Sequence, residues 1–367
     1  MIDKPHQALL PAGMADLLPP EAELEAHAAE GLMATFEGNG YERVKPPLVE
    51  FEENLMMGSG AATAAQSFRL MDPISHRMMA VRADMTIQIA RIASSRLSDL
   101  PRPLRLSYSG QVLRIKGSDL RPERQFGQVG AELIGSASPA ADVEIIIMAA
   151  KGLQDLGMTG LSFDLGIPTL VPEICKDLGI EGDDDKLALR TALNQKDAAA
   201  IANLSPKAAS VFSVLLSAVG PVDKSLPIMN KLKLSHQAEQ ERDHLEAVIG
   251  FLKDRAPELS LTVDPVEIRG YEYHTGLTFT IFAKGLKGEL GRGGRYVSAN
   301  NPAFEGGEMA TGVTLFIDTV LHSLPKPSPA NRMFVPLGSN DKDVQKFAAE
   351  GWVSIAELEL SQTQVAE

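Results

Sequence analysis

The sequence has almost no cysteine, since Cys175 is the only one in 367 residues. A single thiol excludes an internal disulfide and a metal cluster built from several thiolates, and it is typical of proteins from a reducing compartment. No stretch approaches the ~20 apolar residues that a membrane span needs, and residues 1–6 lack a basic leader followed by an apolar core. We therefore expect a cytoplasmic protein that is not inserted in a membrane.

The motifs of several catalytic classes are also missing. The seven histidines (6, 27, 76, 236, 244, 274 and 322) include no His-x-x-x-His pair, so no metal site is predicted. His236 and His244 are interpreted as residues on the surface of a helix. There is no Gly-x-Ser-x-Gly motif, and Gly291–Gly294 lacks the lysine and the spacing of a phosphate-binding loop. We expect neither a metal nor another cofactor.

Positive charge is scarce, with 35 Lys and Arg against 48 Asp and Glu and a formal net charge of -13. Such a chain repels polyanions, whose binding depends on contacts with phosphates. Arg91, Arg96, Arg102 and Arg105 are near one another in the sequence, and we interpret them as solvated surface or helix-end charge. The composition therefore disfavours tRNA as a partner.

What the chain does contain is enough apolar material for a large core, with 44% hydrophobic residues. Periodicity predicts a helix over residues 21–36 and a helix that begins at Ser138-Pro139. Proline in the extended segment 44–50 favours the edge of a sheet. Strands are predicted over residues 104–115, 125–134 and 277–283, the first two antiparallel and the last followed by a glycine-rich turn at 288–294.

Residues from about 164 to 258 are rich in Leu and Ala and are broken by Gly and Pro, which predicts a helical insertion. Its last helix, about residues 238–254, has an apolar face. Prolines 325, 327 and 329 predict a linker to a short strand, helix and strand, which are too small to fold alone and should dock on the main body or on a partner. We predict a main domain of residues 1–163 and 259–324, an insertion at 164–258 and a tail at 325–367.

Several segments resemble, in content and in order, the signatures of the histidyl-tRNA synthetase family. They are Gly40–Glu50 (GYERVKPPLVE), Arg82–Thr86 (RADMT), Gly110–Arg114 (GQVLR), Gln128–Glu132 (QVGAE), Glu267–Gly276 (EIRGYEYHTG) and Gly291–Tyr296 (GRGGRY). The resemblance covers nearly the whole chain before the linker, apart from the insertion. It implies an α+β fold, with the antiparallel sheet of class II aminoacyl-tRNA synthetases flanked by helices, and a homodimer formed through the first segment.

The resemblance also implies a pocket for L-histidine. This ligand needs a carboxylate for its ammonium, a guanidinium for its carboxylate and a polar partner for its imidazole. Carried over by position, Asp84 and Thr86 would face the amino group, Gln128 and Arg269 the polar end of the amino acid, and Glu132, Tyr273 and His274 the imidazole. Arg114, in the position of the first arginine that holds ATP in the family, completes the expected site. Taken alone, Glu132 would be interpreted as a surface-facing strand residue, but its company favours the pocket.

The chain departs from the synthetases at residues needed for adenylation. The third signature, Gly312–Thr319 here, ends on Thr319 where the family has an arginine that holds ATP. The loss of such a donor commonly lowers the rate on the order of 10²–10³-fold. Ala83 replaces a proline, Asp84 a longer glutamate and His274 a tyrosine. The tail is also shorter than an anticodon-reading domain of about a hundred residues.

This combination, together with Leu189–Asp197 (LRTALNQKD), resembles the regulatory subunits of ATP phosphoribosyltransferase, the first enzyme of histidine biosynthesis. The resemblance implies a non-catalytic chain that binds and activates the short-form catalytic subunit and takes part in feedback inhibition by histidine, in a hetero-oligomer built on synthetase-like dimers. Two alternatives stay open. A truncated, diverged synthetase would catalyse histidine-dependent ATP–pyrophosphate exchange. A histidine sensor, or an aminoacyl-transfer relative that acts on another protein, would not bind the phosphoribosyltransferase.

Overall fold

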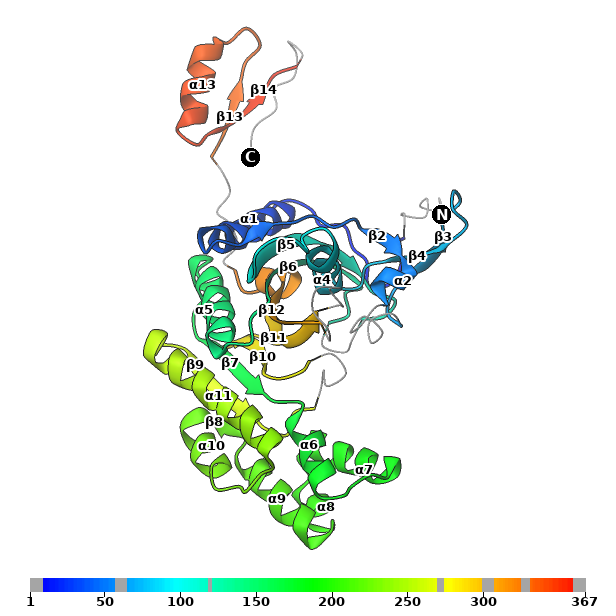
Figure 1. Cartoon of the computed structure of the whole chain (residues 1–367). Helices are drawn as coiled ribbons and strands as arrows, with labels where there is room; N and C mark the ends of the chain where they lie inside the picture. The colour runs from blue at the N-terminus through cyan, green and yellow to red at the C-terminus, as the bar shows by residue number, and fades with distance from the viewer. Residues whose placement is uncertain are drawn as a thin grey trace, which may run out of the picture. The chain divides into compact units, whose positions relative to one another are not determined.

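The computed structural model describes residues 9–56, 65–117, 121–268, 274–298, 307–324 and 331–358. The chain divides into two compact units, Met1–Leu324 and Pro325–Glu367. The centre of the larger unit is a nine-stranded sheet with the order β1-β5-β6-β12-β11-β10-β7-β9-β8 (Figure 1). The strands are β1 Glu42–Arg43, β5 Leu104–Leu113, β6 Gln125–Ile134, β7 Leu161–Gly166, β8 Gly220–Pro221, β9 Ser260–Asp264, β10 Thr278–Ala283, β11 Gly291–Ser298 and β12 Glu308–Phe316.

Most neighbouring strands of this sheet are antiparallel. The parallel pairs, β1 with β5 and β7 with β9, lie toward its two ends. The predicted antiparallel pairing of β5 with β6 is confirmed over ten residue pairs, from Leu104 opposite Ile134 to Leu113 opposite Gln125. The predicted α+β fold with an antiparallel sheet flanked by helices is therefore confirmed.

Alternation along β6 separates the two faces of the sheet. Val129, Ala131 and Leu133 belong to the core shared with α1 (Glu21–Gly38) and α5 (Pro139–Asp155). Gln128 and Glu132 point to the opposite face, which α4 (Thr86–Ser95) covers by packing on β6 and β11. Figure 1 shows α4 and the α1–α5 pair on different sides of the strands. The polar motif residues of β6 therefore lie beneath α4.

Two helices were predicted from their local signals, and both are confirmed. The helix predicted over residues 21–36 is α1. The side chain of Ser138 accepts a hydrogen bond from the backbone N–H of Ala140, and Pro139 occupies the first turn of α5. This is the capping arrangement that the sequence indicates. A short helix, α12 (Ile317–Leu321), follows β12 directly.

Helices dominate the chain between β7 and β9. They are α6 Leu170–Asp177, α7 Asp183–Asn194, α8 Ala198–Ala202, α9 Pro206–Ser217, α10 Val222–Met229 and α11 His236–Arg255. The predicted apolar face of α11 is buried at Leu245, Val248, Ile249 and Leu252. The end of β7 and the whole of β8 extend the central sheet into the predicted insertion. Its boundaries stay a prediction, because these helices belong to the same compact unit as the sheet.

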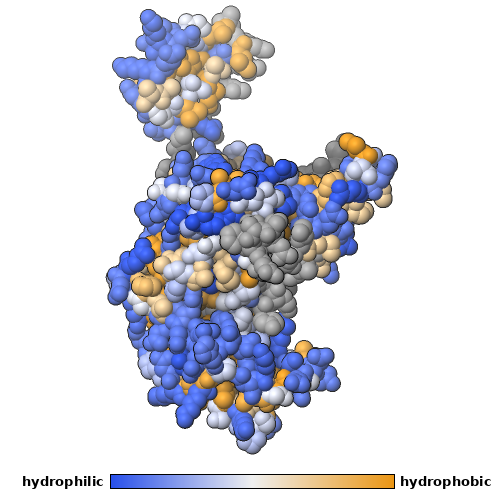
Figure 2. All heavy atoms as spheres, viewed as in Figure 1, coloured by the Kyte–Doolittle hydropathy of each residue, from blue (hydrophilic) through white to orange (hydrophobic). Residues whose placement is uncertain are grey.

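The proline-bearing segment 44–50 forms less strand than expected. Only Val49–Phe51 (β2) is a strand, because proline lacks the N–H that a ladder requires. It does lie at an edge, in a second sheet of order β2-β4-β3 with β3 Arg69–Met71 and β4 Met78–Val81, and it leads into α2 (Glu52–Leu55). Figure 2 shows apolar side chains at the outer end of this sheet, where Met71 and Ile74 are 62% and 89% exposed. Exposed apolar groups of this kind are typical of interaction surfaces.

The prediction of a glycine-rich turn at residues 288–294 is wrong for Gly291–Gly294. These residues are in β11, between β10 and β12. A Cβ atom at Gly293 would lie 2.2 Å from the carbonyl oxygen of Gly312 and 2.3 Å from the ring of Phe279. The glycines are therefore needed for close packing between strands and not for a turn.

The smaller unit contains the predicted strand, helix and strand. β13 (Arg332–Val335) and β14 (Val353–Ala356) pair in parallel, and α13 (Asp341–Ala349) lies between them in the sequence. No residue of α13 is buried within this unit. That this tail docks on the main body or on a partner stays a prediction. Among the described residues, no helix has the length and apolarity to span a membrane.

Candidate functional site

Glu132 is the centre of a buried polar network beneath α4. It is 1% exposed, and its two carboxylate oxygens accept hydrogen bonds from the hydroxyls of Tyr108 (3.1 Å) and Tyr296 (2.9 Å). The two tyrosines belong to β5 and β11, the strands that carry the GQVLR and GRGGRY segments. The interpretation of Glu132 as a surface residue is therefore wrong, because its strand is covered on this face.

The environment of Glu132 changes its protonation. Burial raises the pKa of Glu132 to about 8, against the opposing effect of the hydroxyl donors. The carboxyl group is therefore largely protonated at pH 7. A protonated carboxyl can donate to a neutral nitrogen, and its ionised form can accept from a cationic one. Glu132 can therefore form a hydrogen bond with either a neutral or a protonated imidazole.

A second carboxylate lies at the start of α4. Oδ1 of Asp84 accepts from the backbone N–H of Thr86 (2.9 Å), and Oδ2 accepts from Nε2 of Gln128 (3.0 Å). The amide oxygen of Gln128 accepts in turn from the backbone N–H of Met85 (3.2 Å), and the hydroxyl of Thr86 lies 3.2 Å from that of Tyr108. Four of the predicted site residues, Asp84, Thr86, Gln128 and Glu132, thus belong to one hydrogen-bonded network with acceptors suited to an ammonium group.

The other predicted residues lie around this network or outside the described residues. Arg114, after the end of β5, donates from Nε to the carbonyl oxygen of Ala83 (3.3 Å), and burial lowers its pKa. The ring Nδ1 of His274 lies 3.1 Å from the carbonyl oxygen of Arg295. Burial lowers the pKa of His274 to about 4, so the ring is neutral at pH 7. Arg269 and Tyr273 lie outside the described residues.

The surroundings of Thr319 contain an arginine that the sequence did not single out. Arg121 donates to the hydroxyl of Thr319 (3.1 Å), and its Nε lies 3.1 Å from the carboxylate of Asp318. Its guanidinium also stacks 3.8 Å from the centre of the Phe316 ring. Arg121 is only 9% exposed. Its donors are thus directed at protein acceptors next to the position where the family has its ATP-holding arginine.

Sequence reasoning missed the hydroxyls that surround Glu132, namely those of Tyr108, Tyr296 and Thr314, the last of which lies 2.9 Å from the Tyr108 hydroxyl. Two glycines in the sequence mark the positions where these side chains cross the neighbouring strands. A Cβ atom at Gly130 would lie 2.3 Å from the Tyr108 hydroxyl, and one at Gly312 would lie 1.8 Å from Oε2 of Glu132. A glycine opposite a polar strand residue indicates that a side chain crosses the strand there.

The interpretation of the four arginines as solvated charge is wrong for three of them. Arg91 pairs with Glu50 at 2.5 Å, Arg102 with Glu308 at 2.5 Å and Arg105 with Glu144 at 2.7 Å. Arg96 is exposed. The paired arginines join helices and strands within the fold and do not form a free basic face. No group of His, Cys, Asp and Glu that could hold a metal ion occurs in the described part of the chain.

Comparisons with known proteins agree with this architecture. The family model described as histidyl-tRNA synthetase matches residues 13–320. The ATP phosphoribosyltransferase regulatory subunit of Paramagnetospirillum magneticum is 52% identical, over 98% of this chain and 93% of that protein. The regulatory subunit of Rhodospirillum centenum is 50% identical, over 97% of this chain and 90% of that protein.

Solved structures share the fold. The ATP phosphoribosyltransferase regulatory subunit/histidyl-tRNA synthetase of Bacillus halodurans has a TM-score of 0.83 at 23% identity, over 99% of this chain and 96% of that chain. A chain of the ATP phosphoribosyl transferase (HisG:HisZ) complex of Thermotoga maritima has a TM-score of 0.61 at 17% identity, over 80% of this chain and 97% of that chain. With the match of the family model and the two close relatives, the conclusion is that this chain belongs to the histidyl-tRNA synthetase-like family of ATP phosphoribosyltransferase regulatory subunits.

Proposed function

We propose that this chain is a regulatory subunit without catalytic activity of its own. It binds the short-form catalytic subunit of ATP phosphoribosyltransferase in the cytoplasm, raises the rate of the first step of histidine biosynthesis and takes part in its inhibition by L-histidine. The observation that carries this proposal is the combination of an intact polar network around Glu132 with a threonine at position 319. The first suits a ligand, and the second removes a group that adenylation needs.

The network fits the functional groups of L-histidine. Asp84, held by Gln128 and by the backbone of Thr86, offers a carboxylate to the ligand's ammonium. Glu132 offers its carboxyl group to the imidazole, and Arg269 supplies the guanidinium for the ligand's carboxylate. Hydrogen bonds to charged groups contribute roughly 1.5 to 3 kcal/mol each. A few of them together are sufficient for specific recognition of a free amino acid.

Arg121 supports the assignment of a non-catalytic role. Adenylation requires donors aimed at charge that develops on the attacked phosphate. Arg121 lies near position 319, but it is buried against Phe316, forms an ion pair with Asp318 and donates a hydrogen bond to Thr319. Its donors are directed at these side chains, so Arg121 is not arranged to replace the missing arginine of the third signature.

Regulation by this chain would be allosteric. L-Histidine must bind the inhibited assembly better than the active one, and a coupling of ~1–3 kcal/mol between the two subunits is sufficient for useful control. We place the chain in the assembly as a homodimer formed through the synthetase-like core. The paired arginines and the net charge of -13 argue against tRNA as a further partner.

The test is the rate at which a short-form catalytic subunit joins ATP to phosphoribosyl pyrophosphate, with and without this chain and with L-histidine added to each. We expect the chain to raise the rate and the mixture to be inhibited by L-histidine. No activation at concentrations well above those needed for assembly would reject the proposal. Histidine-dependent ATP–pyrophosphate exchange by the chain alone would instead establish the truncated synthetase.

The proposed pocket has its own test. Glu132→Ala and Arg269→Ala each remove a polar partner of the ligand, so we expect the dissociation constant for L-histidine, measured by calorimetry, to rise by about ten- to a hundredfold. Glu246→Gln is the control, because Glu246 is an exposed acid on α11 that bonds Asn230. Unchanged binding in both pocket variants would remove the assignment.

A further inference from the structure

Arg295 lies between the candidate histidine site and the helical segment. Its neighbour on β11, Tyr296, donates to Glu132 beneath α4. Because successive side chains of a strand point to opposite faces, Arg295 points to the other side of the sheet, toward α5 and α11. It is only 3% exposed. Tyr296 thus contacts the network around Glu132, and the adjacent Arg295 contacts helices α5 and α11 on the opposite face of the sheet.

The side chain of Arg295 is held by several acceptors. Nε donates to Oδ2 of Asp142 (2.8 Å), Nη1 to the carbonyl oxygen of Ser136 (3.0 Å) and Nη2 to that of Ser138 (2.5 Å). Asp142, in the first turn of α5, is completely buried. A buried guanidinium with this many charge-assisted bonds has a fixed orientation.

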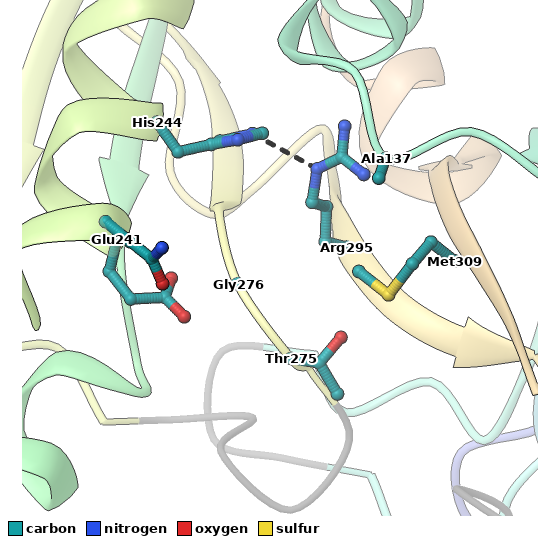
Figure 3. A pocket seen from close by; sticks show the side chains of 8 residues that line it. Ala137, Glu241, His244, Thr275, Gly276, Arg295 and Met309 are labelled. Atoms are coloured by element: carbon teal, nitrogen blue, oxygen red, sulfur yellow. Dashed lines mark hydrogen bonds between the residues drawn. The ribbon is translucent and has the colours of Figure 1, made fainter. Parts of the chain in front are cut away.

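His244 connects this buried pair to α11. Its Nε2 lies 2.7 Å from Oδ2 of Asp142. It also lies 3.1 Å from Nε of Arg295, the contact that is drawn as a dashed line in Figure 3. Nε of Arg295 donates to Nε2 of His244, and Nε2 donates to Asp142 when it carries the ring hydrogen. The expectation that His236 and His244 are both simple helix-surface residues is therefore wrong for His244, whose side chain is 23% exposed and points inward.

The backbone of Arg295 contacts the segment that contains His274 and Thr275. Its carbonyl oxygen accepts from the backbone N–H of Thr275 (3.0 Å) and lies 3.1 Å from Nδ1 of His274. These residues directly follow Tyr273 in the sequence and belong to the same Glu267–Gly276 segment as Arg269. One residue therefore bonds the segment predicted to bind L-histidine through its backbone and the last helix of the insertion through its side chain.

A cavity of about 180 Å³ lies where these parts meet. It is lined from α11 by Glu241 and His244, and from the sheet side by Thr275, Arg295 and Met309 (Figure 3). Close-packed interiors transmit displacement from one element to the next, whereas a cavity leaves room for a second arrangement. The cavity would accommodate a shift of α11, and the hydrogen bonds of Arg295 to His244 and Thr275 would carry that shift to residues 274–276.

We infer that Arg295 and His244 are positioning residues that couple occupation of the histidine site to the position of α11. The inference rests on the proposed function, because it takes L-histidine as the ligand. Coupling of this kind is reciprocal: if L-histidine favours one position of α11, whatever holds α11 in that position raises the affinity for L-histidine. A partner that binds the insertion and fixes the position of α11 would then change the affinity of the pocket for L-histidine.

The test compares hydrogen–deuterium exchange of α11 amides with and without L-histidine in the full chain, together with L-histidine affinity by calorimetry. We expect L-histidine to change exchange in α11 of the wild type. His244→Leu keeps the apolar bulk but removes the ring nitrogen that contacts Asp142 and Arg295, so this response is lost and the dissociation constant changes by about twofold to thirtyfold. His244→Gln, which restores an N–H near Nε2, should recover the response. Asp243→Asn, an exposed neighbour on α11, is the control.

General destabilisation by His244→Leu would raise exchange equally with and without L-histidine, so the ligand-induced difference isolates coupling. An undiminished α11 response in His244→Leu overturns the inference, as does a wild type that binds L-histidine with no α11 response. If such a chain still activates the catalytic subunit, the proposed function stands and only the inference falls. A wild type that fails to bind L-histidine rejects both the pocket and the inference.

Discussion

Glu132 is the centre of a buried hydrogen-bonded network and the proposed partner of the ligand's imidazole, and its pH dependence is open to measurement. Burial raises its pKa from a usual 4.5 to about 8. Folding therefore takes up a proton between these pH values. The contribution of Glu132 to stability is full below about pH 4.5 and is lost as the pH rises through 8.

Glu132→Gln replaces the titrating group by a neutral one of similar shape. We expect the melting temperature of the wild type to fall more between pH 5 and pH 9 than that of the variant, when both are measured by calorimetric scans across this range. Asp164, Glu241 and Asp318, whose pKa values are also raised by burial, titrate in both proteins. They therefore cancel in the comparison. Parallel pH profiles would show that Glu132 stays ionised in the folded chain.

Gly312 provides the space that Glu132 occupies. The added Cβ of Gly312→Ala would lie 1.8 Å from Oε2 of Glu132 and 2.9 Å from the carbonyl oxygen of Ala131. Overpacking of this kind destabilises by about 1–3 kcal/mol, and displacement of the carboxyl should abolish detectable L-histidine binding. Gly250→Ala in α11 is the matched control, because nothing lies within 4 Å of its Cβ. There we expect unchanged binding and up to ~1 kcal/mol of added stability. L-Histidine binding by Gly312→Ala at wild-type affinity would contradict this account.

The residues of the site were not equally predictable. Asp84 and Glu132 occur in short sequence motifs, so their role could be predicted from neighbouring residues. Tyr108 and Tyr296 reach Glu132 only because β5 pairs with β6 and β11 pairs with β12 in a particular register. Such register depends on contacts between distant segments, so the partners of Glu132 could not be assigned from the sequence alone.

Elements with local signals were predicted better than elements set by their neighbours. α5 was placed correctly because its cap and first-turn proline act within a few residues. β11 was mistaken for a turn, since a glycine run is equally typical of a turn and of tight packing between strands. Its contacts with Phe279 and Gly312 decide between the two, and they come from other strands.

The cap of α5 allows a prediction at the scale of the element. Ser138→Ala removes the acceptor of the Ala140 N–H and should lower the free energy of unfolding by about 0.5–2 kcal/mol in denaturant titrations. The bond that Nη2 of Arg295 donates to residue 138 uses only the backbone carbonyl of that residue and is kept. Ser235→Ala is the control, because the Ser235 side chain makes no cap hydrogen bond at the start of α11. Equal losses in the two variants would assign the effect to something other than the cap.

At the scale of the whole molecule, the distribution of charge bears on the proposal that this chain does not bind tRNA. The net charge is -13, and Arg91, Arg102 and Arg105 are engaged with carboxylates inside the fold. A protein binds nucleic acid by exchanging counterions of the phosphates for its own cations. Arginines that are already paired with carboxylates of the chain can contribute little to this exchange.

We therefore expect no saturable binding of tRNA by this chain at about 0.15 M salt, measured by fluorescence anisotropy with labelled histidine tRNA. Non-specific binding by a cationic protein typically has a dissociation constant of about 10⁻⁴–10⁻⁶ M under such conditions. Because the net charge of this chain is negative, we expect its dissociation constant for tRNA to be higher than that range. A histidyl-tRNA synthetase titrated in parallel verifies that the tRNA is competent. L-Histidine binding by the same sample verifies that the chain is folded. Micromolar or tighter binding that weakens steeply with salt would reveal a basic surface and return the truncated synthetase to consideration. If the chain binds L-histidine but not tRNA, it has kept the binding of the synthetase's amino-acid substrate and lost the binding of its tRNA substrate.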